Sequence, residues 1–150
     1  MIRPNKLLYN LFRPSAKLVR YYVHPQAWIG GQIFSSFGIK VKRDNFSGIP
    51  GAIFTPRKNV NTKSIIFYLH GGGYCFGSSL TTHKVGLTKL AKQTGSVCYS
   101  VDYRLAPEHQ YPAALDDALT AWKHIVSQNP NCNIILAGDS AGGGLSLALV

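Results

Sequence analysis

The chain has 150 residues, of which 45% are hydrophobic and 15% charged, a composition typical of one globular domain rather than a disordered chain. No apolar stretch approaches the roughly 20 residues that a membrane-spanning helix needs, so transmembrane, collagen-like and low-complexity proteins are excluded. The formal net charge is +10; residues 1–63 carry eleven Lys and Arg and one acid, whereas residues 64–150 carry five of each sign.

This uneven charge allows two interpretations. A basic N-terminal region can contact an anionic membrane surface or an acidic partner. Alternatively, acidic residues outside this sequence balance the charge, and we favour this second interpretation. The region has no interleaved aromatic platforms and no recognition fold of the kind that nucleic-acid-binding domains use, so no nucleic-acid partner is predicted.

The cysteines and the N-terminus bear on the cellular compartment. Cys75, Cys98 and Cys132 lack metal-ligand spacing and are odd in number, so neither a metal site nor a disulfide is predicted. The N-terminus has no continuous apolar region of the secretory kind. We expect a reducing, cytoplasmic location; an acid-free, Arg-rich start also resembles an organellar transit peptide.

The first 36 residues have a helical pattern. Apolar residues recur every three to four positions between Leu7 and Val23, with Lys and Arg elsewhere on the helical wheel. Pro14 is expected to separate two short helices. We predict that residues 1–36 form a helical cover segment packed on the rest of the chain, which is residues 37–150.

The remaining chain predicts a hairpin followed by alternating strands and helices. Residues 38–43 and 52–56 are short β-like runs joined by turn residues, as in an antiparallel hairpin. The later predicted elements are strands at residues 64–69, 96–101 and 133–137, and helices at residues 82–93, at residues 112–128 and after Gly142. This alternation predicts an α/β fold with a doubly wound parallel sheet.

One sequence motif lies at the last predicted strand-to-helix junction. Gly138-Asp139-Ser140-Ala141-Gly142 matches G-x-S-x-G, in which a strained turn raises the Ser140 hydroxyl clear of the sheet. Gly138 and Gly142 allow the neighbouring chain to pass closely. The N–H of Ala141, at the start of the next helix, is expected to face a developing oxyanion.

A second motif, His70-Gly71-Gly72-Gly73, follows the predicted strand at residues 64–69. Consecutive glycines leave backbone N–H groups accessible to a substrate oxygen. A flexible turn and a phosphate-binding loop are the alternatives, but the Gly-Lys-Ser/Thr ending of a P-loop is absent. The two motifs occur in the order that hydrolases of the α/β type require.

Together with Asp102-Tyr103-Arg104-Leu105-Ala106-Pro107-Glu108-His109, these motifs resemble the hormone-sensitive-lipase-like branch of the α/β-hydrolases, from about Gly38 to Val150. The resemblance implies a carboxylesterase or lipase that acts on small-molecule esters and uses no metal or organic cofactor. It implies that Ser140 is the nucleophile. The implied oxyanion-hole donors are Gly72, Gly73 and Ala141, and the implied supporting residues are His70, Gly71, Gly138, Asp139 and Gly142.

The resemblance also implies two further catalytic residues, an acid and a histidine, that do not follow Ser140 in this sequence. Hydrolases of this fold place an acid and then a histidine after the nucleophile, whereas His109 and the other four histidines precede Ser140. Residues 141–150 contain neither an acid nor a histidine. Arg104 and Glu108 are expected to be structural residues of their loop.

We therefore expect the chain to be truncated after the nucleophile turn, with the triad Asp or Glu and His beyond Val150. Alone it is not expected to fold stably, because half of the sheet would be absent and the strand at residues 134–137 would need a parallel neighbour. It is also not expected to be catalytic, because a serine without a base is a poor nucleophile. The alternative is a non-catalytic protein that binds a small ligand on the same fold. The sequence gives no prediction of the oligomeric state.

Overall fold

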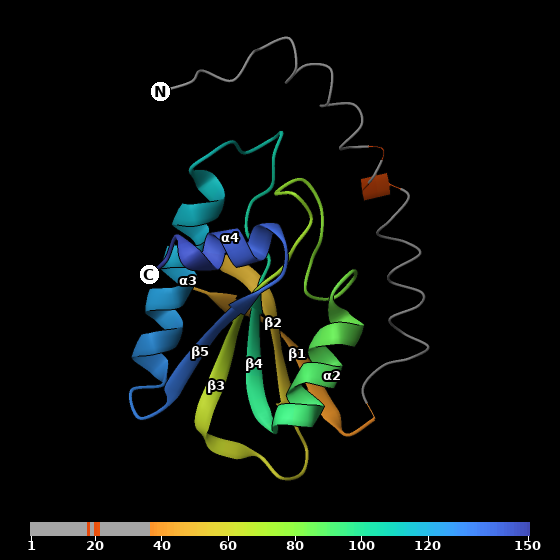
Figure 1. The fold of residues 1–150 in the computed structure, drawn as a ribbon, viewed down its shortest axis with the longest axis vertical. Coiled ribbons are helices and arrows are strands. Elements are labelled where there is room, and N and C mark those ends of the chain that lie inside the picture. Colours follow the sequence, from red (N-terminus) through yellow and green to blue (C-terminus); the bar gives the residue numbers. More distant parts are fainter. Residues whose placement is uncertain (1–17, 19, 22–36) are drawn as a thin grey trace.

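A single mixed β-sheet organises the computed structural model, which describes Leu18, Arg20, Tyr21 and residues 37–150 (Figure 1). The strand order is β1-β2-β4-β3-β5. The bounds are β1 Ile39–Phe46, β2 Ile49–Pro56, β3 Asn61–Leu69, α2 Lys84–Thr94, β4 Ser96–Val101, α3 Ala113–Gln128, β5 Asn133–Gly138 and α4 Ala141–Leu147. β4, β3 and β5 are parallel, whereas β1 and β2 pair antiparallel, so the predicted α/β sheet with an N-terminal hairpin is confirmed.

The hairpin is tighter than the sequence predicted. Residues 45–51 were expected to be a loop, but β1 runs to Phe46 and β2 resumes at Ile49. The turn is Ser47 and Gly48 alone, with φ of 55° and 94°. Two positive φ angles match the twist of antiparallel strands, and the Gly48 N–H donates to the Asn45 side-chain oxygen at 2.6 Å, which stabilises the short turn.

Helices cover both faces of the sheet. Alternate side chains of a strand point to opposite faces, so Phe67 and Leu69 of β3 pack toward α3 and α4, while Ile66 packs toward α2. In Figure 1, α3 and α4 lie together and α2 lies apart from them. Burial on both faces explains the continuous apolar run of β3.

The helix boundaries near the predicted nucleophile differ from the expectation. A helix was predicted to begin after Gly142, but α4 begins at Ala141, directly after Ser140. Ser140 therefore caps the helix. The predicted cover segment lies outside the described residues except for Leu18, Arg20 and Tyr21, which are helical.

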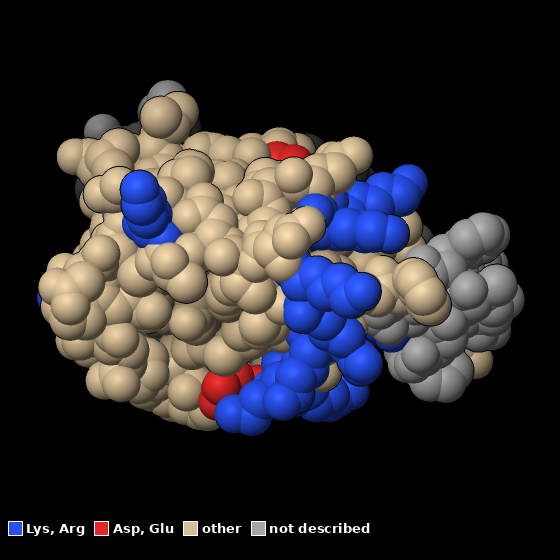
Figure 2. Space-filling view, turned by 90° about the horizontal axis from the view of Figure 1, so that it is seen from below, with Lys and Arg blue, Asp and Glu red and all other residues tan. Residues whose placement is uncertain are grey.

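Basic side chains gather where the parallel strands begin. Arg57, Lys58 and Lys92 line a hollow of about 590 Å³ there, next to Phe37, which is 92% exposed. Figure 2 views the molecule from this end and shows a band of Lys and Arg. Ser140 follows the carboxyl end of β5, so this basic band and the predicted nucleophile lie at opposite ends of the sheet.

Candidate active site

The two sequence motifs meet because β3 and β5 are neighbours in the sheet. The strands are parallel and in register, with Leu69 opposite Gly138 at their carboxyl ends. The chain leaves β3 as His70–Gly73 and leaves β5 as Asp139–Ser140. Segments almost 70 residues apart in sequence therefore emerge side by side at the edge where α/β proteins bind ligands.

Ser140 occupies a strained turn between β5 and α4. Its φ is 49° and its ψ is −120°, a conformation that non-glycine residues rarely adopt, and its side chain is exposed. The turn is tight: a Cβ on Gly138 would lie 2.5 Å from the Gly142 carbonyl oxygen, and a Cβ on Gly142 would lie 2.0 Å from that of Leu69. Only glycine fits at either position.

The glycine loop after β3 is held in a defined conformation. Gly72 and Gly73 have φ of 126° and 58°. The N–H groups of Cys75 and Phe76 donate to the Gly72 carbonyl at 2.9 and 3.1 Å, which closes the loop. Within the described part of the chain, the N–H groups of Gly72, Gly73 and Ala141 have no hydrogen-bond acceptor. These three residues are the predicted oxyanion donors.

The carboxylate of Asp139 joins the nucleophile turn to the glycine loop. It accepts hydrogen bonds from the Gly71 N–H and from the Tyr68 hydroxyl, both at 2.9 Å, and His83 Nε2 lies 3.2 Å away. Burial raises the pKa of Asp139, but the hydrogen bonds from Tyr68, Gly71 and His83 outweigh burial and leave the pKa below its usual value. Asp139 is therefore an anion that holds the glycine loop in place through its hydrogen bond from the Gly71 N–H.

His70 is a buried structural group in this arrangement. Its ring stacks on Tyr103 with centroids 4.3 Å apart, and its Nδ1 donates to the Gly71 carbonyl at 2.8 Å. Burial lowers the pKa of His70, so the neutral ring is favoured. The Tyr103 hydroxyl donates to the His70 carbonyl, which fixes the start of the glycine loop from both sides.

Sequence reasoning missed Tyr68, His83 and Tyr103 as parts of the site. Tyr68 and Tyr103 carried a weak signal, since each lies within two residues of the carboxyl end of a parallel strand. His83 carried none, because it lies in the loop before α2 and reaches Asp139 only through the fold.

The connection from β4 to α3 lies against the glycine loop. Asp102 accepts from the N–H and the hydroxyl of Ser79, both at 2.6 Å. Arg104 forms a bidentate ion pair with the buried carboxylate of Asp117, and Glu108 pairs with Arg20 at 2.8 Å. The side chains of Arg104 and Glu108 thus form ion pairs with other side chains of the protein, and neither is bonded to Ser140.

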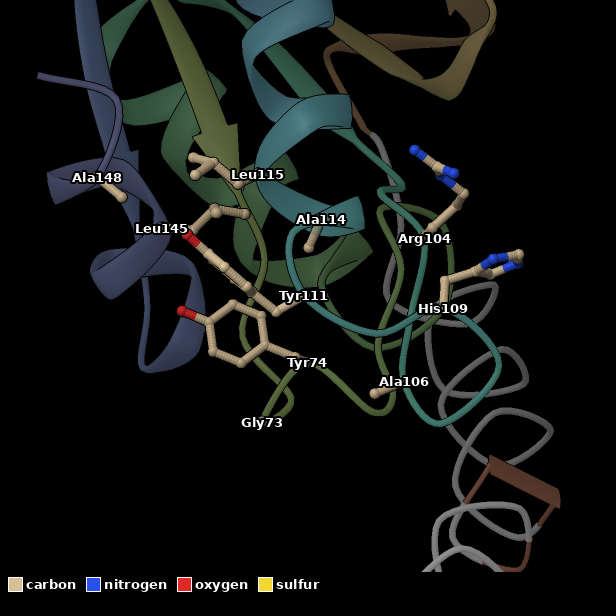
Figure 3. A pocket seen from close by; sticks show the side chains of 10 residues that line it. All are labelled: Gly73, Tyr74, Arg104, Ala106, His109, Tyr111, Ala114, Leu115, Leu145 and Ala148. Atoms are coloured by element: carbon tan, nitrogen blue, oxygen red, sulfur yellow. The ribbon is translucent and has the colours of Figure 1, made fainter. Parts of the chain in front are cut away.

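A pocket of about 410 Å³ adjoins the glycine loop (Figure 3). Its walls come from the glycine loop, the β4–α3 connection, α3 and α4. Figure 3 shows Tyr74, Tyr111 and Leu145 converging on the pocket, whereas the side chains of Arg104 and His109 point away from it. The apolar lining includes Ala106, Ala114, Leu115, Leu145 and Ala148.

No histidine among the described residues bonds the Ser140 hydroxyl. His70 and His83 make the contacts given above, His109 is exposed, and His124 lies 2.9 Å from the Ser47 hydroxyl on the hairpin side. His24 lies outside the described residues. The described part of the chain also contains no group of three His, Cys, Asp or Glu side chains placed to hold a metal ion.

This geometry suits acyl transfer. An exposed hydroxyl at a helix N-terminus lies next to a loop with unpaired N–H groups, and such donors stabilise the oxyanion that forms when a nucleophile attacks a carbonyl. The neighbouring apolar pocket offers space for the group attached to that carbonyl.

Comparison with known proteins points the same way. Residues 66–150 match a family model described as alpha/beta hydrolase fold. An esterase of Acinetobacter venetianus is 35% identical over 113 residues, which are 74% of this chain and 36% of that protein. A carboxylesterase of Mycobacterium tuberculosis is 36% identical over 112 residues, covering 71% and 34%. Human arylacetamide deacetylase-like 2 is 37% identical over 120 residues, covering 74% and 30%.

Solved structures show the same likeness. A hormone-sensitive-lipase homologue from a metagenome library superposes with a TM-score of 0.75 at 33% identity, over 99% of this chain and 50% of that one. An esterase of the bacterial hormone-sensitive lipase family gives 0.74 at 32% identity, over 84% and 42%. The chain spans about a third of the length of the curated relatives named above.

Within the described residues, no helix has the length and apolar character required to cross a bilayer.

Proposed function

The chain belongs to the α/β-hydrolase family, in its hormone-sensitive-lipase-like branch, and we propose that the whole protein is a serine carboxylester hydrolase that acts through an acyl-enzyme on Ser140. The observation that carries this proposal is the conformation of Ser140. A non-glycine residue with φ of 49°, exposed between β5 and α4, costs folding free energy of order 1–3 kcal/mol. A nucleophile that must stand clear of the sheet accounts for that cost.

In the proposed reaction, the Ser140 oxygen attacks the ester carbonyl, and its proton passes to a base. The carbonyl oxygen becomes an oxyanion, which accepts hydrogen bonds from the N–H groups of Gly72, Gly73 and Ala141. Removing one such donor in other enzymes costs about 3 kcal/mol of transition-state stabilisation, so this preorganised set carries much of the rate. Collapse expels the alcohol, and water then hydrolyses the acyl-enzyme.

The base is assigned by chain order. The rings of His70, His83 and His124 make contacts elsewhere, and the His109 side chain points away from the pocket. Hydrolases of this fold take the acid and the histidine from segments that follow the nucleophile. The proposal therefore assigns proton transfer to a histidine that follows Ser140 in the whole protein. Ser140, the glycine loop and the pocket are the parts supplied by residues 37–150.

The pocket supports esters with a small to medium apolar group. Its volume of about 410 Å³ is within the range of small-molecule sites, and its apolar lining favours a hydrocarbon or aromatic group over a charged one. Gly73 lies at the junction of the pocket and the glycine loop, so a group held there has its carbonyl beside the proposed oxyanion donors.

The test is hydrolysis of p-nitrophenyl acetate and butyrate by the whole protein, by Ser140→Ala and by Ser127→Ala. Ser127 is an exposed serine of α3 whose hydroxyl bonds the His124 carbonyl, so it is a matched control. We expect Ser140→Ala to lose at least about 10³-fold in kcat and Ser127→Ala to keep wild-type activity. Ester binding without turnover by the wild-type protein would instead indicate a ligand-binding protein on this fold.

A further inference from the structure

One cation from the N-terminal segment reaches the glycine loop. Arg20 Nε donates to the Cys75 carbonyl, and one Nη donates to the Ala106 carbonyl. The other Nη lies 2.8 Å from a Glu108 carboxylate oxygen. A single guanidinium thus bonds the residue after Tyr74 on the glycine loop and two residues of the β4–α3 connection.

The two segments that Arg20 joins are also bonded to each other. The Ala106 N–H donates to the Tyr74 carbonyl at 2.8 Å. Tyr74 has φ of 59°, so the end of the glycine loop follows a sparsely populated conformation that its surroundings must hold in place. Arg20 bonds the next carbonyl along, that of Cys75, and this limits how far the loop can open.

The geometry requires arginine rather than any cation. The guanidinium is planar, always charged and presents its donors in a fixed fork, so it can serve two carbonyls and a carboxylate at once. A lysine ammonium is a compact point charge on a flexible stem and cannot span the same three acceptors. The Arg20 side chain is 25% exposed, which reduces competition from water for these bonds.

We propose that Arg20 is a positioning residue for the oxyanion hole: it fixes the glycine loop against the β4–α3 connection and so sets the direction of the Gly72 and Gly73 N–H groups. This inference rests on the proposed ester hydrolysis. It assigns to Arg20, a residue of the N-terminal segment, a part in transition-state stabilisation.

The test compares Arg20→Lys and Arg20→Gln in the whole protein with Arg57→Gln as control. Arg57 is exposed at the far end of the sheet, so its variant makes the same charge change away from the site. We expect both Arg20 variants to lose between about 10-fold and 100-fold in kcat with little change in KM, as small misplacements of catalytic groups do. Arg57→Gln is expected to keep wild-type kinetics.

A second readout separates positioning from general support of the fold. An alkylboronic acid that forms a tetrahedral adduct on Ser140 places an oxygen in the oxyanion hole. Its inhibition constant is expected to rise in Arg20→Lys by the same factor by which kcat/KM falls, and methylguanidinium is expected to restore part of the activity of Arg20→Ala. Arg20 variants that have a lower melting temperature but the kcat and boronate affinity of the wild type would overturn the inference.

A variant of the partner residue Glu108 keeps the inference testable where Arg20 is needed for folding. Glu108→Gln removes the ion pair but leaves both carbonyl bonds of Arg20, so we expect kcat to stay within about threefold of the wild-type value. A loss of about tenfold or more would assign the effect to the ion pair instead. Wild-type protein without Ser140-dependent turnover would refute the proposed function itself. Wild-type turnover with unaffected Arg20 variants would refute only the role of Arg20.

Discussion

The carboxylate of Asp139 accepts a hydrogen bond from the backbone N–H of Gly71 at 2.9 Å, across 68 positions of sequence. Asp139 directly precedes the proposed nucleophile, and Gly71 directly precedes the proposed oxyanion donors. A Cβ on Gly71 would lie 2.2 Å from the same carboxylate, so the contact exists only because residue 71 is glycine. Nucleophile and oxyanion loop are thus positioned by one shared group.

Asp139→Asn is expected to lower kcat/KM about tenfold, less than the loss of an oxyanion donor itself, because the change acts through Gly71. Asparagine can still accept from Gly71 and Tyr68, which both donate to the same carboxylate oxygen. The change removes the negative charge and places an NH₂ donor instead of the second oxygen, 3.3 Å from His83 Nε2, so a His83 Nε2–H loses its acceptor. Steady-state kinetics with p-nitrophenyl butyrate measures the effect, and Asp116→Asn, an exposed position on α3, is the control. Wild-type kcat/KM in Asp139→Asn would contradict the proposed coupling.

Gly142→Ala and Gly143→Ala provide a matched pair on α4. A Cβ at Gly142 would lie 2.0 Å from the Leu69 carbonyl oxygen, whereas at Gly143 the nearest atom is 3.4 Å away. We expect Gly142→Ala to lose about 3 kcal/mol or more of unfolding free energy through overpacking. Gly143→Ala is expected to be neutral or to gain up to about 1 kcal/mol from helix propensity. Urea unfolding measures both, and equal stabilities would show that the turn has room at residue 142.

Much of the fold followed from sequence because its signals were local. The apolar run in β3 has residues buried on both faces, and the predicted range for β4, residues 96–101, matches the observed strand. The order of strands and helices implied the parallel arrangement that brings His70 and Ser140 to one edge. The errors were at boundaries, where Ser47-Gly48 forms a shorter turn than its polar and glycine-rich surroundings suggested.

The contacts around the site could not be predicted because they depend on how segments pack. His83 and Asp139 are 56 positions apart, and Arg20 and Glu108 are 88 apart, with no spacing rule that connects them. Arg20 was one of eleven basic residues in residues 1–63, whose charge was interpreted as contact with an anionic partner or, as we favoured, as balanced by acids outside this sequence. Its contacts with two carbonyls and a carboxylate appear only once the β4–α3 connection is placed.

Acid is expected to destabilise the protein in two steps. Burial lowers the pKa of His70 below the usual 6.5, so the unfolded state binds its proton first and stability falls as pH drops below about 6.5, by at most about 1.4 kcal/mol per pH unit for one group. The pKa of Asp139 is lower in the folded state than its usual value of 3.8. Asp139 therefore contributes stability that is present above about pH 3.8 and is lost as the pH falls through the folded-state pKa.

His70 can be followed directly by the pH dependence of its ring proton signals in NMR spectra. We expect the midpoint of the His70 titration to lie below pH 6.5. A midpoint above pH 6.5 would contradict the buried neutral ring. In urea unfolding, the His70→Gln variant is expected to show a shallower loss of stability between pH 7 and pH 5 than the wild type.

Ala114→Phe tests the pocket. Ala114 lines it from the first turn of α3, and a phenyl ring there would occupy part of its volume (Figure 3). We expect kcat/KM for p-nitrophenyl hexanoate to fall at least about tenfold while the acetate ester changes by less than about threefold, since a few methylenes are worth several kcal/mol in such sites. Parallel losses for both esters would show that the acyl group lies elsewhere; Ala113→Phe is the neighbouring control.

The most direct test of the central claim is to locate the acyl group. The whole protein is mixed with p-nitrophenyl butyrate, quenched in acid within the first turnover, digested and analysed by mass spectrometry. We predict a butyryl group on the peptide that contains Ser140, together with a burst of p-nitrophenol close to one per protein molecule. Turnover with no acylated peptide, or with the acyl group on another residue, would contradict catalysis through Ser140.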